Sequence, residues 1–213
     1  MGKYQNFNKS PFSVHTQILN SVKRKSKVLD VGCAEGYLSK IIASNECEVV
    51  GIELNKDAGQ KAVKYCKEVI IGNVESIELN NKYYEYFDFV ILADVLEHLK
   101  DPLKILIKFK KYLKDNGCII ISVPNIANWR VRFKLMTGKF DYENQGILDE
   151  EHLRFFTEKT FKKLIIDAGL EIYKFNLTVG DLNILAGFFH SFGLMWPNLM
   201  SYQFLIIAKK KLN

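Results

Sequence analysis

The sequence has few cysteines, and their arrangement indicates neither a disulfide framework nor a zinc site. Cys33, Cys47, Cys66 and Cys118 form no C-x-x-C pair, and no histidine lies near them at ligand spacing. Small disulfide-stapled domains and zinc-binding modules both need such spacings. The chain therefore fits the reducing environment of the cytoplasm.

Long apolar runs are also missing. The N-terminal MGKYQNFNKSPFS contains no apolar core of signal-peptide length, and no stretch of about 18 uncharged apolar residues follows it. We therefore expect neither secretion nor a membrane-spanning helix.

A large excess of charge of one sign is missing as well. The formal net charge is only +6, and it includes the terminal run Lys209, Lys210 and Lys211, which is typical of a solvated tail. Charge alone does not indicate a nucleic-acid-binding protein. With 213 residues, 48% hydrophobic content and no internal repeat or linker, we expect one domain over residues 1–213.

The chain does contain a regular alternation of short apolar runs and longer helical patterns. VLDV, EVVGIE, EVIIGN, FDFVILAD and CIIISVP are near-continuous apolar runs, which indicates strands buried on both faces. Apolar residues at helical spacing in 37–44, 56–66 and 103–113 predict crossover helices. The repeated βαβ pattern predicts a doubly wound α/β fold.

The rhythm changes after Pro124. We expect a loop-like segment to about residue 149, a helix over 157–168, and the strands LEIYKFNL and QFLIIAKK. The aromatic stretch 185–200, LAGFFHSFGLMWPNLM, lies between those strands. Core packing or a homodimer surface explains it best, and a peripheral membrane contact is the other interpretation.

The stretch VLDVGCAEG falls at the first βα turn, where ligands bind in such folds. A dinucleotide fingerprint would place glycines at the positions of Gly32, Ala34 and Tyr37, and a tyrosine in the close-packing position argues against NAD. The extra small residue is Gly36. The pattern allows the backbone to approach a flat, uncharged or zwitterionic ligand. A tight turn that binds no ligand is also consistent with the same pattern.

These residues resemble the class I S-adenosylmethionine-dependent methyltransferases, whose first motif is similar to VLDVGCAEG. The resemblance implies a Rossmann-like, seven-stranded, mostly parallel sheet with an antiparallel last strand, and S-adenosyl-L-methionine as cofactor with S-adenosyl-L-homocysteine as product. It also implies that Asp30 lies near the methionine amino group and that Gly32 and Gly36 pass under the cofactor. Asp30 could equally be a satisfied buried acid.

The resemblance extends to the ends of the next strands. Glu53 ends the second strand, where an acid can accept two hydrogen bonds from a ribose diol. Asn73 stands where many relatives carry an aspartate that binds the adenine amino group, and Val74 would pack on the adenine face. An asparagine chosen for turn geometry is the alternative. Asp94 closes the fourth strand, and Glu97 and His98 follow within one helical turn; His98 either contacts the site or braces the sheet.

The acceptor half, residues 126–200, is harder to interpret than the cofactor half, residues 28–125. The Asn/Asp-Pro-Pro-aromatic run of base-flipping amino methyltransferases is absent, and VPN carries no nucleophilic cysteine, so nucleic acid is the weaker acceptor. The segment GILDEEHLRFFT resembles a narrower group of small bacterial methyltransferases associated with surface-polysaccharide assembly. This resemblance implies a glycan or other small-molecule acceptor.

A sugar hydroxyl needs a general base, and His152 is our first candidate, with His98 second. Asp149 and Glu150 flank His152 and could orient its ring, although a packing or helix-capping histidine is equally consistent. The chemistry requires no metal, and no acidic cluster in the sequence demands one. O-methylation is therefore the leading hypothesis. The alternatives are N-methylation of a small amine and a catalytically silent, cofactor-binding assembly protein.

Overall fold

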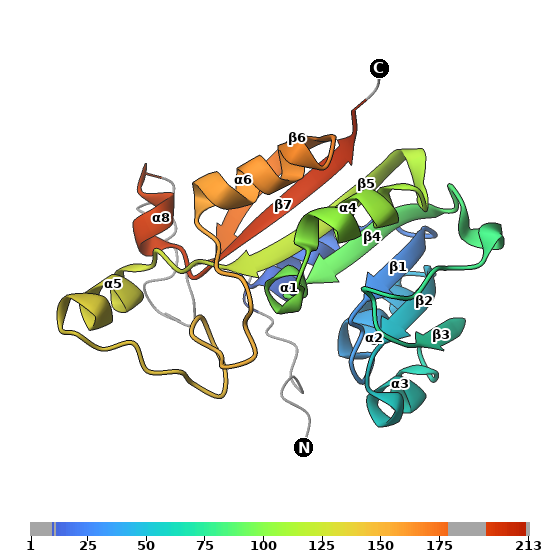
Figure 1. Ribbon diagram of the computed structural model, residues 1–213. Coiled ribbons are helices and arrows are strands. Elements are labelled where there is room, and N and C mark those ends of the chain that lie inside the picture. The colour runs from blue at the N-terminus through green and yellow to red at the C-terminus, as the bar shows by residue number, and fades with distance from the viewer. Residues whose placement is uncertain (1–9, 11, 179–194, 212–213) are drawn as a thin grey trace.

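The computed structural model describes residues 10, 12–178 and 195–211 (Figure 1). Its elements are α1 (Val14–Ser21), β1 (Lys27–Val31), α2 (Tyr37–Ser44), β2 (Glu48–Glu53), α3 (Lys56–Ala62), β3 (Glu68–Ile71), η1 (Asn81–Tyr83), β4 (Phe87–Ala93), η2 (Leu96–His98), α4 (Pro102–Lys110), β5 (Leu113–Pro124), α5 (Trp129–Met136), α6 (Glu158–Asp167), β6 (Leu170–Thr178), α8 (Pro197–Met200) and β7 (Gln203–Lys210). None of the helices in these ranges is long and apolar enough to cross a membrane.

The strands form one seven-stranded sheet in the order β3-β2-β1-β4-β5-β7-β6. Every neighbouring pair is parallel except the two that include β7, which runs antiparallel to both β5 and β6. This confirms the predicted mostly parallel sheet with an antiparallel last strand.

Helices cover both faces of the sheet (Figure 1). One buried layer contains Ile18 of α1 and Ile42 of α2, and the other contains Phe109 of α4 and Phe161 of α6. Because both faces are buried, the central strands lose the polar alternation of a half-exposed sheet. The near-continuous apolar runs of the sequence follow from this burial.

Three of the predicted helices, α3, α4 and α6, begin at residues whose side chains cap their first backbone amides. The Asn55 side chain accepts from Asp57 and Ala58 at the start of α3, and the Asp101 side chain accepts from Lys104 at the start of α4. Thr157 forms a capping box with Thr160 at the start of α6. Such caps satisfy amides that have no partner inside the helix.

The expectation of a loop-like segment from Pro124 to about residue 149 was wrong in part, because α5 lies within it. The Asn128 side chain caps α5 by accepting from the Arg130 amide. Val131 is its one buried residue, so most of the helix faces away from the core. A helix without a core-facing apolar stripe leaves little periodic signal in the sequence.

The strand order reverses between β1 and β4, since the chain first builds outward through β2 and β3 and then returns to the other side of β1. Loops at the carboxyl ends of β1 and β4 therefore leave in opposite directions and open a crevice. In doubly wound folds this switch point is where ligands bind.

Candidate functional site

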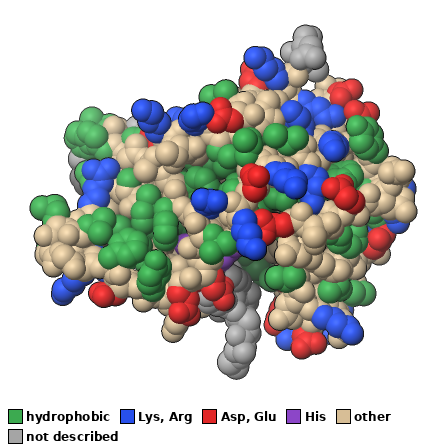
Figure 2. Space-filling model, viewed as in Figure 1, with side chains coloured by type: hydrophobic (Ala, Val, Ile, Leu, Met, Phe, Trp, Pro, Cys, Tyr) green, Lys and Arg blue, Asp and Glu red, His purple; other side chains and the backbone are tan. Residues whose placement is uncertain are grey.

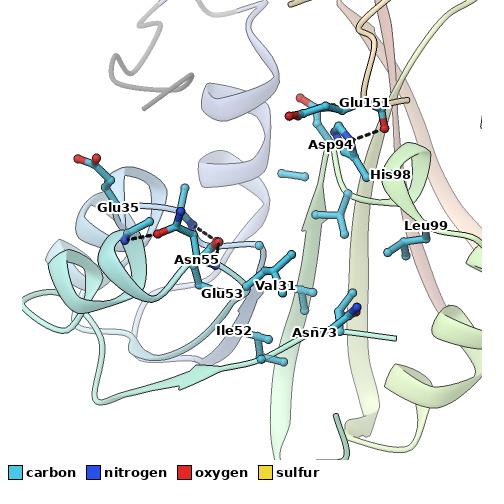
Figure 3. Close-up of a pocket in the computed structure, with 18 of the residues that line it drawn as sticks. Val31, Glu35, Ile52, Glu53, Asn55, Asn73, Asp94, His98, Leu99 and Glu151 are labelled. Carbon is cyan, nitrogen blue, oxygen red and sulfur yellow. Dashed lines mark hydrogen bonds between the residues drawn. The ribbon is translucent and has the colours of Figure 1, made fainter. Parts of the chain in front are cut away.

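A pocket of about 910 Å³ opens at this switch point (Figure 3). The carboxyl ends of β1, β2 and β4 and the loops after β1, β2, β3 and η2 line it. The lining includes eight residues that the sequence analysis or the turn motif singled out: Gly32, Ala34, Tyr37, Glu53, Asn73, Val74, Asp94 and His98. A volume of this order suits a ligand of nucleoside size or larger.

The turn after β1 is unusual because Gly32, Ala34 and Gly36 all have positive φ angles, of 73°, 48° and 81°. The Gly32 amide donates to the Ile52 carbonyl at 2.8 Å, which ties the turn to β2. A Cβ on Gly32 would lie 2.9 Å from the Val95 side chain. The chain therefore needs small residues here to turn sharply between two neighbouring strands.

Glu53 braces this turn from the end of β2. Its carboxylate accepts from the Ala34 amide and from the Asn55 amide, each at 2.8 Å. A carboxylate has about four lone-pair positions, so two such bonds leave acceptor capacity toward the pocket. Figure 3 shows Glu53 and Asn55 together at one end of the pocket.

Asn73 and Val74 line the pocket after β3. The Asn73 side-chain oxygen accepts from the Glu75 amide at 2.8 Å, so the residue also serves turn geometry. Val74 packs against the buried core layer that contains α4. The bond to Glu75 agrees with the turn-geometry interpretation of Asn73, and adenine binding stays a prediction.

Asp30 and Gly36 lie behind the pocket lining. Asp30 is buried on the α2 side of β1, and its carboxylate accepts from the Ser39 hydroxyl at 2.6 Å. Burial raises the pKa of Asp30 to about 6, against the lowering effect of the Ser39 bond. Gly36 begins α2, and a Cβ there would lie 2.9 Å from the Ala62 backbone of α3. Gly36 thus provides the close helix packing.

Asp94 has a positive φ of 54° at the end of β4. Its two carboxylate oxygens accept from the Ser122 hydroxyl and from the Gln203 amide group, each at 2.8 Å. Burial raises the pKa of Asp94, while these two bonds oppose the rise. Side chains from β5 and β7 therefore hold Asp94 at the sheet edge.

The two candidate bases differ in their relation to the pocket. His98 lines the pocket, whereas His152 is buried beside it and is not part of the lining. The two rings meet edge to face, with centroids 4.8 Å apart. Asp149 is buried, and its side chain accepts from the Glu151 amide. The choice of His152 relied on its sequence neighbours, which do not show which of the two histidines lines the pocket.

The acceptor-side aromatics lie away from the pocket lining. Trp129 and Tyr142 are exposed, and exposed hydrophobic side chains gather over α5 and the segment that follows it (Figure 2). Phe156 is buried in the core, whereas Leu153 and Phe155 are exposed. Residues 185–194, most of the aromatic stretch 185–200, lie outside the described residues.

Glu97 is a buried acidic residue beside the pocket, and the sequence predicted no role for it. It is 1% exposed, and neither of its carboxylate oxygens has a hydrogen-bond partner among the described residues. Burial raises the pKa of Glu97 well above its usual range, and the nearby Asp94 and Asp149 raise it further. Its position within one turn of Asp94 and His98 was the only signal in the sequence.

Comparison with known proteins gives a consistent family. Residues 5–174 match the family described as "Methyltransferase domain". The chain is 23% identical over 160 residues to a ubiquinone biosynthesis O-methyltransferase of Rickettsia canadensis, covering 74% of this chain and 68% of that protein. It is 33% identical over 107 residues to a protein of the same name from Actinobacillus pleuropneumoniae, covering 46% of each.

The fold has relatives among solved structures as well. A protein from Methanosarcina mazei, titled as an S-adenosylmethionine-dependent methyltransferase, superposes with a TM-score of 0.66 at 20% identity, covering 92% of this chain and 98% of that one. At this identity the likeness establishes the fold. Together with the seven-stranded sheet, it confirms the predicted fold class.

Proposed function

The chain belongs to the methyltransferase domain family, and we propose that it transfers a methyl group from S-adenosyl-L-methionine to a hydroxyl oxygen of a small molecule. One observation carries the proposal. A single pocket joins Glu53, where a ribose diol would bind, to His98, where an acceptor hydroxyl would lose its proton. The names of the curated relatives support oxygen as the acceptor atom.

S-adenosyl-L-methionine is the cofactor, and it supplies a methyl group activated on a sulfonium sulfur. The residues present fit it by their chemistry. The carboxylate of Glu53 is fixed by two backbone amides and has lone pairs left for two ribose hydroxyls. The Asn73 side-chain oxygen holds the Glu75 amide, which leaves the NH₂ group as a donor for the adenine ring. Val74 supplies an apolar surface beside it.

The acceptor binds at the His98 end of the pocket. Methyl transfer from a sulfonium is an in-line displacement, so alignment of the hydroxyl with the methyl group supplies much of the rate. A hydroxyl also has to lose a proton, and a positioned base contributes about 10² to 10⁴ in rate. We assign this proton transfer to His98 rather than to His152, because His98 is the histidine that lines the pocket.

The acceptor class is a small molecule with a hydroxyl group. The glycan acceptor implied by the sequence resemblance has no support from the curated relatives, whose names refer to ubiquinone biosynthesis. Phenols and sugar nucleotides therefore both belong in the test.

The test is label transfer from methyl-labelled S-adenosyl-L-methionine to four groups of acceptors: phenols, sugar nucleotides, small amines and RNA. We expect label in a hydroxyl compound, with turnover reduced in Glu53→Ala at limiting cofactor and retained in Glu48→Ala, which changes the other end of β2. Label found only in amines or in RNA would overturn the oxygen acceptor. Absence of transfer to every acceptor, with cofactor binding intact, would indicate a cofactor-binding assembly protein instead.

A further inference from the structure

Glu97 presents two buried carboxylate oxygens without a hydrogen-bond partner among the described residues. Buried polar groups are normally paired, because burial without a partner costs free energy. Here the unpaired group is a carboxylate with 1% exposure, next to the pocket wall. An unpaired carboxylate in such a place requires either a proton or a cation.

Two histidines lie beside it. Glu97, His98 and His152 each offer one ligand atom, and these atoms all lie within 4.8 Å of one another. Glu97 and His98 are consecutive in η2, whereas His152 comes from the segment between α5 and α6. The two segments are tied together, because the Leu153 and Arg154 amides donate to the Glu97 carbonyl at 2.8 and 2.9 Å.

The histidine rings are oriented as metal ligands usually are. Nδ1 of His98 lies 3.2 Å from the Glu151 carbonyl, and Nδ1 of His152 lies 3.2 Å from the Ile147 carbonyl. A carbonyl is an acceptor only, so each Nδ1 carries the proton and each Nε2 carries the lone pair. A backbone carbonyl on the second ring nitrogen is a common support for a metal-bound histidine.

The surrounding charge also favours a cation. The groups that act electrostatically on Glu97 are the carboxylates of Asp94 and Asp149. Both disfavour the ionised form of the Glu97 carboxylate. A divalent ion would stabilise that ionised form.

We propose that Glu97, His98 and His152 bind one divalent transition-metal ion at the acceptor end of the pocket. Two imidazoles and one carboxylate suit Zn²⁺, Mn²⁺, Fe²⁺ or Co²⁺ better than they suit Mg²⁺. Ligand atoms about 2.0–2.2 Å from a tetrahedral ion lie about 3.4 Å apart, so the side chains close slightly on binding.

The ion would contribute to the proposed methyl transfer, and this part of the inference rests on the proposed function. Three protein ligands leave a coordination position open. An acceptor hydroxyl bound there would be a stronger acid than it is in water, so it would pass its proton to water in the open pocket as the methyl group arrives. With the ion bound, His98 acts as a ligand and not as the base. The metal site itself is independent of which acceptor is methylated.

Metal binding is measured directly on the untagged full chain after chelator treatment. Zn²⁺, Mn²⁺ and Mg²⁺ are titrated separately by calorimetry, and bound metal is counted after dialysis. We expect one Zn²⁺ or Mn²⁺ per chain, with affinity lowered at least tenfold in each of Glu97→Gln, His98→Ala and His152→Ala. The control Glu150→Gln removes a neighbouring exposed carboxylate and should bind as the parent does. Circular dichroism and S-adenosyl-L-homocysteine binding report whether each variant folds.

The outcomes separate the two proposals. The metal site is overturned if the parent binds no ion, or if folded Glu97→Gln binds it as tightly as the parent. Methyl transfer that continues in excess chelator would support the proposed O-methyltransferase activity and contradict a role of the ion in it. Stoichiometric binding with loss in all three variants, but no methyl transfer, would support the site and contradict the proposed function.

Discussion

The carboxylate of Glu53 accepts the backbone N–H of Ala34 at 2.8 Å, so the acid that ends β2 holds the turn that follows β1. The residue therefore has two tasks, since it positions the turn and faces the pocket. Loss of this side chain affects ligand binding through both.

We predict that Glu53→Ala weakens the binding of S-adenosyl-L-homocysteine. Loss of the ribose bonds is worth about 1 to 3 kcal/mol, or roughly 5- to 150-fold in affinity. Calorimetry on parent and variant measures it. Glu48→Ala, at the other end of the same strand, should leave the affinity within about twofold. Unchanged affinity in Glu53→Ala would remove Glu53 from the site.

Gly36→Ala should destabilise the fold more than Gly138→Ala does. Both glycines have positive φ, but a Cβ on Gly36 would lie 2.9 Å from the Ala62 backbone, while nothing lies within 4 Å of one on Gly138. The shared conformational cost is about 1 to 2 kcal/mol, and overpacking adds about 1 to 3 kcal/mol at Gly36. Urea unfolding compares the two. Equal losses would show that Gly36 does not mediate the packing of α2 on α3.

Asp30→Asn should raise the free energy of unfolding at pH 7. The pKa of Asp30 is raised from 3.8 to about 6 by burial, so the folded state prefers the protonated form. The stability that this preference contributes is fully present below about pH 3.8 and is lost as the pH rises through 6. At neutral pH the charged form costs roughly 2 to 3 kcal/mol, which the asparagine avoids while keeping an acceptor for Ser39.

Urea unfolding across pH 4.5 to 7.5 tests this, because the difference between Asp30→Asn and the parent should grow with pH. Asp88→Asn is a control of opposite sign. Burial raises the pKa of Asp88, but the bonds from the Lys114 side chain and the Lys27 amide, together with the charges of both lysines, outweigh it, and the pKa lies below its usual value. That variant should lose stability at neutral pH. A pH-independent effect of Asp30→Asn would contradict the raised pKa.

His98→Ala should lower methyl transfer to an oxygen acceptor by about 10² or more, whether His98 takes the proton itself or holds an ion that makes the acceptor hydroxyl more acidic. Cofactor affinity should change less than threefold, because Glu53, the residue proposed to bind the ribose, lies well apart from His98 in the pocket (Figure 3). Single-turnover label transfer at saturating cofactor measures the step. A rate within about threefold of the parent would exclude His98 from proton removal.

The sheet and the cofactor end of the pocket could be predicted because they follow local patterns. Continuous apolar runs report burial on both faces, and the carboxyl ends of parallel strands meet at one edge, so Gly32, Glu53 and Asn73 fall together. The acceptor end could not be predicted in this way. His152 and Glu97 come from segments that lie far apart in the sequence. They meet through the bonds to the Glu97 carbonyl and through the contact of the two histidine rings, and no periodicity in the sequence predicts these contacts.

The helix α5 was missed for a related reason, since it buries only Val131. Asp30 shows the opposite case. Its place in the first motif suggested a ligand contact, yet the alternation of β1 turns its side chain toward α2 and Ser39. A motif position therefore does not by itself show which face of a strand its side chain takes.

The most direct measurement is a calorimetric titration of the full chain with S-adenosyl-L-homocysteine, followed by NADH. The pocket at the β1 and β4 switch point, with Tyr37 in the lining where a dinucleotide fold places glycine, predicts saturation by S-adenosyl-L-homocysteine at one molecule per chain and no saturable binding of NADH. Failure of S-adenosyl-L-homocysteine to bind, or NADH binding that competes with it, would contradict the account.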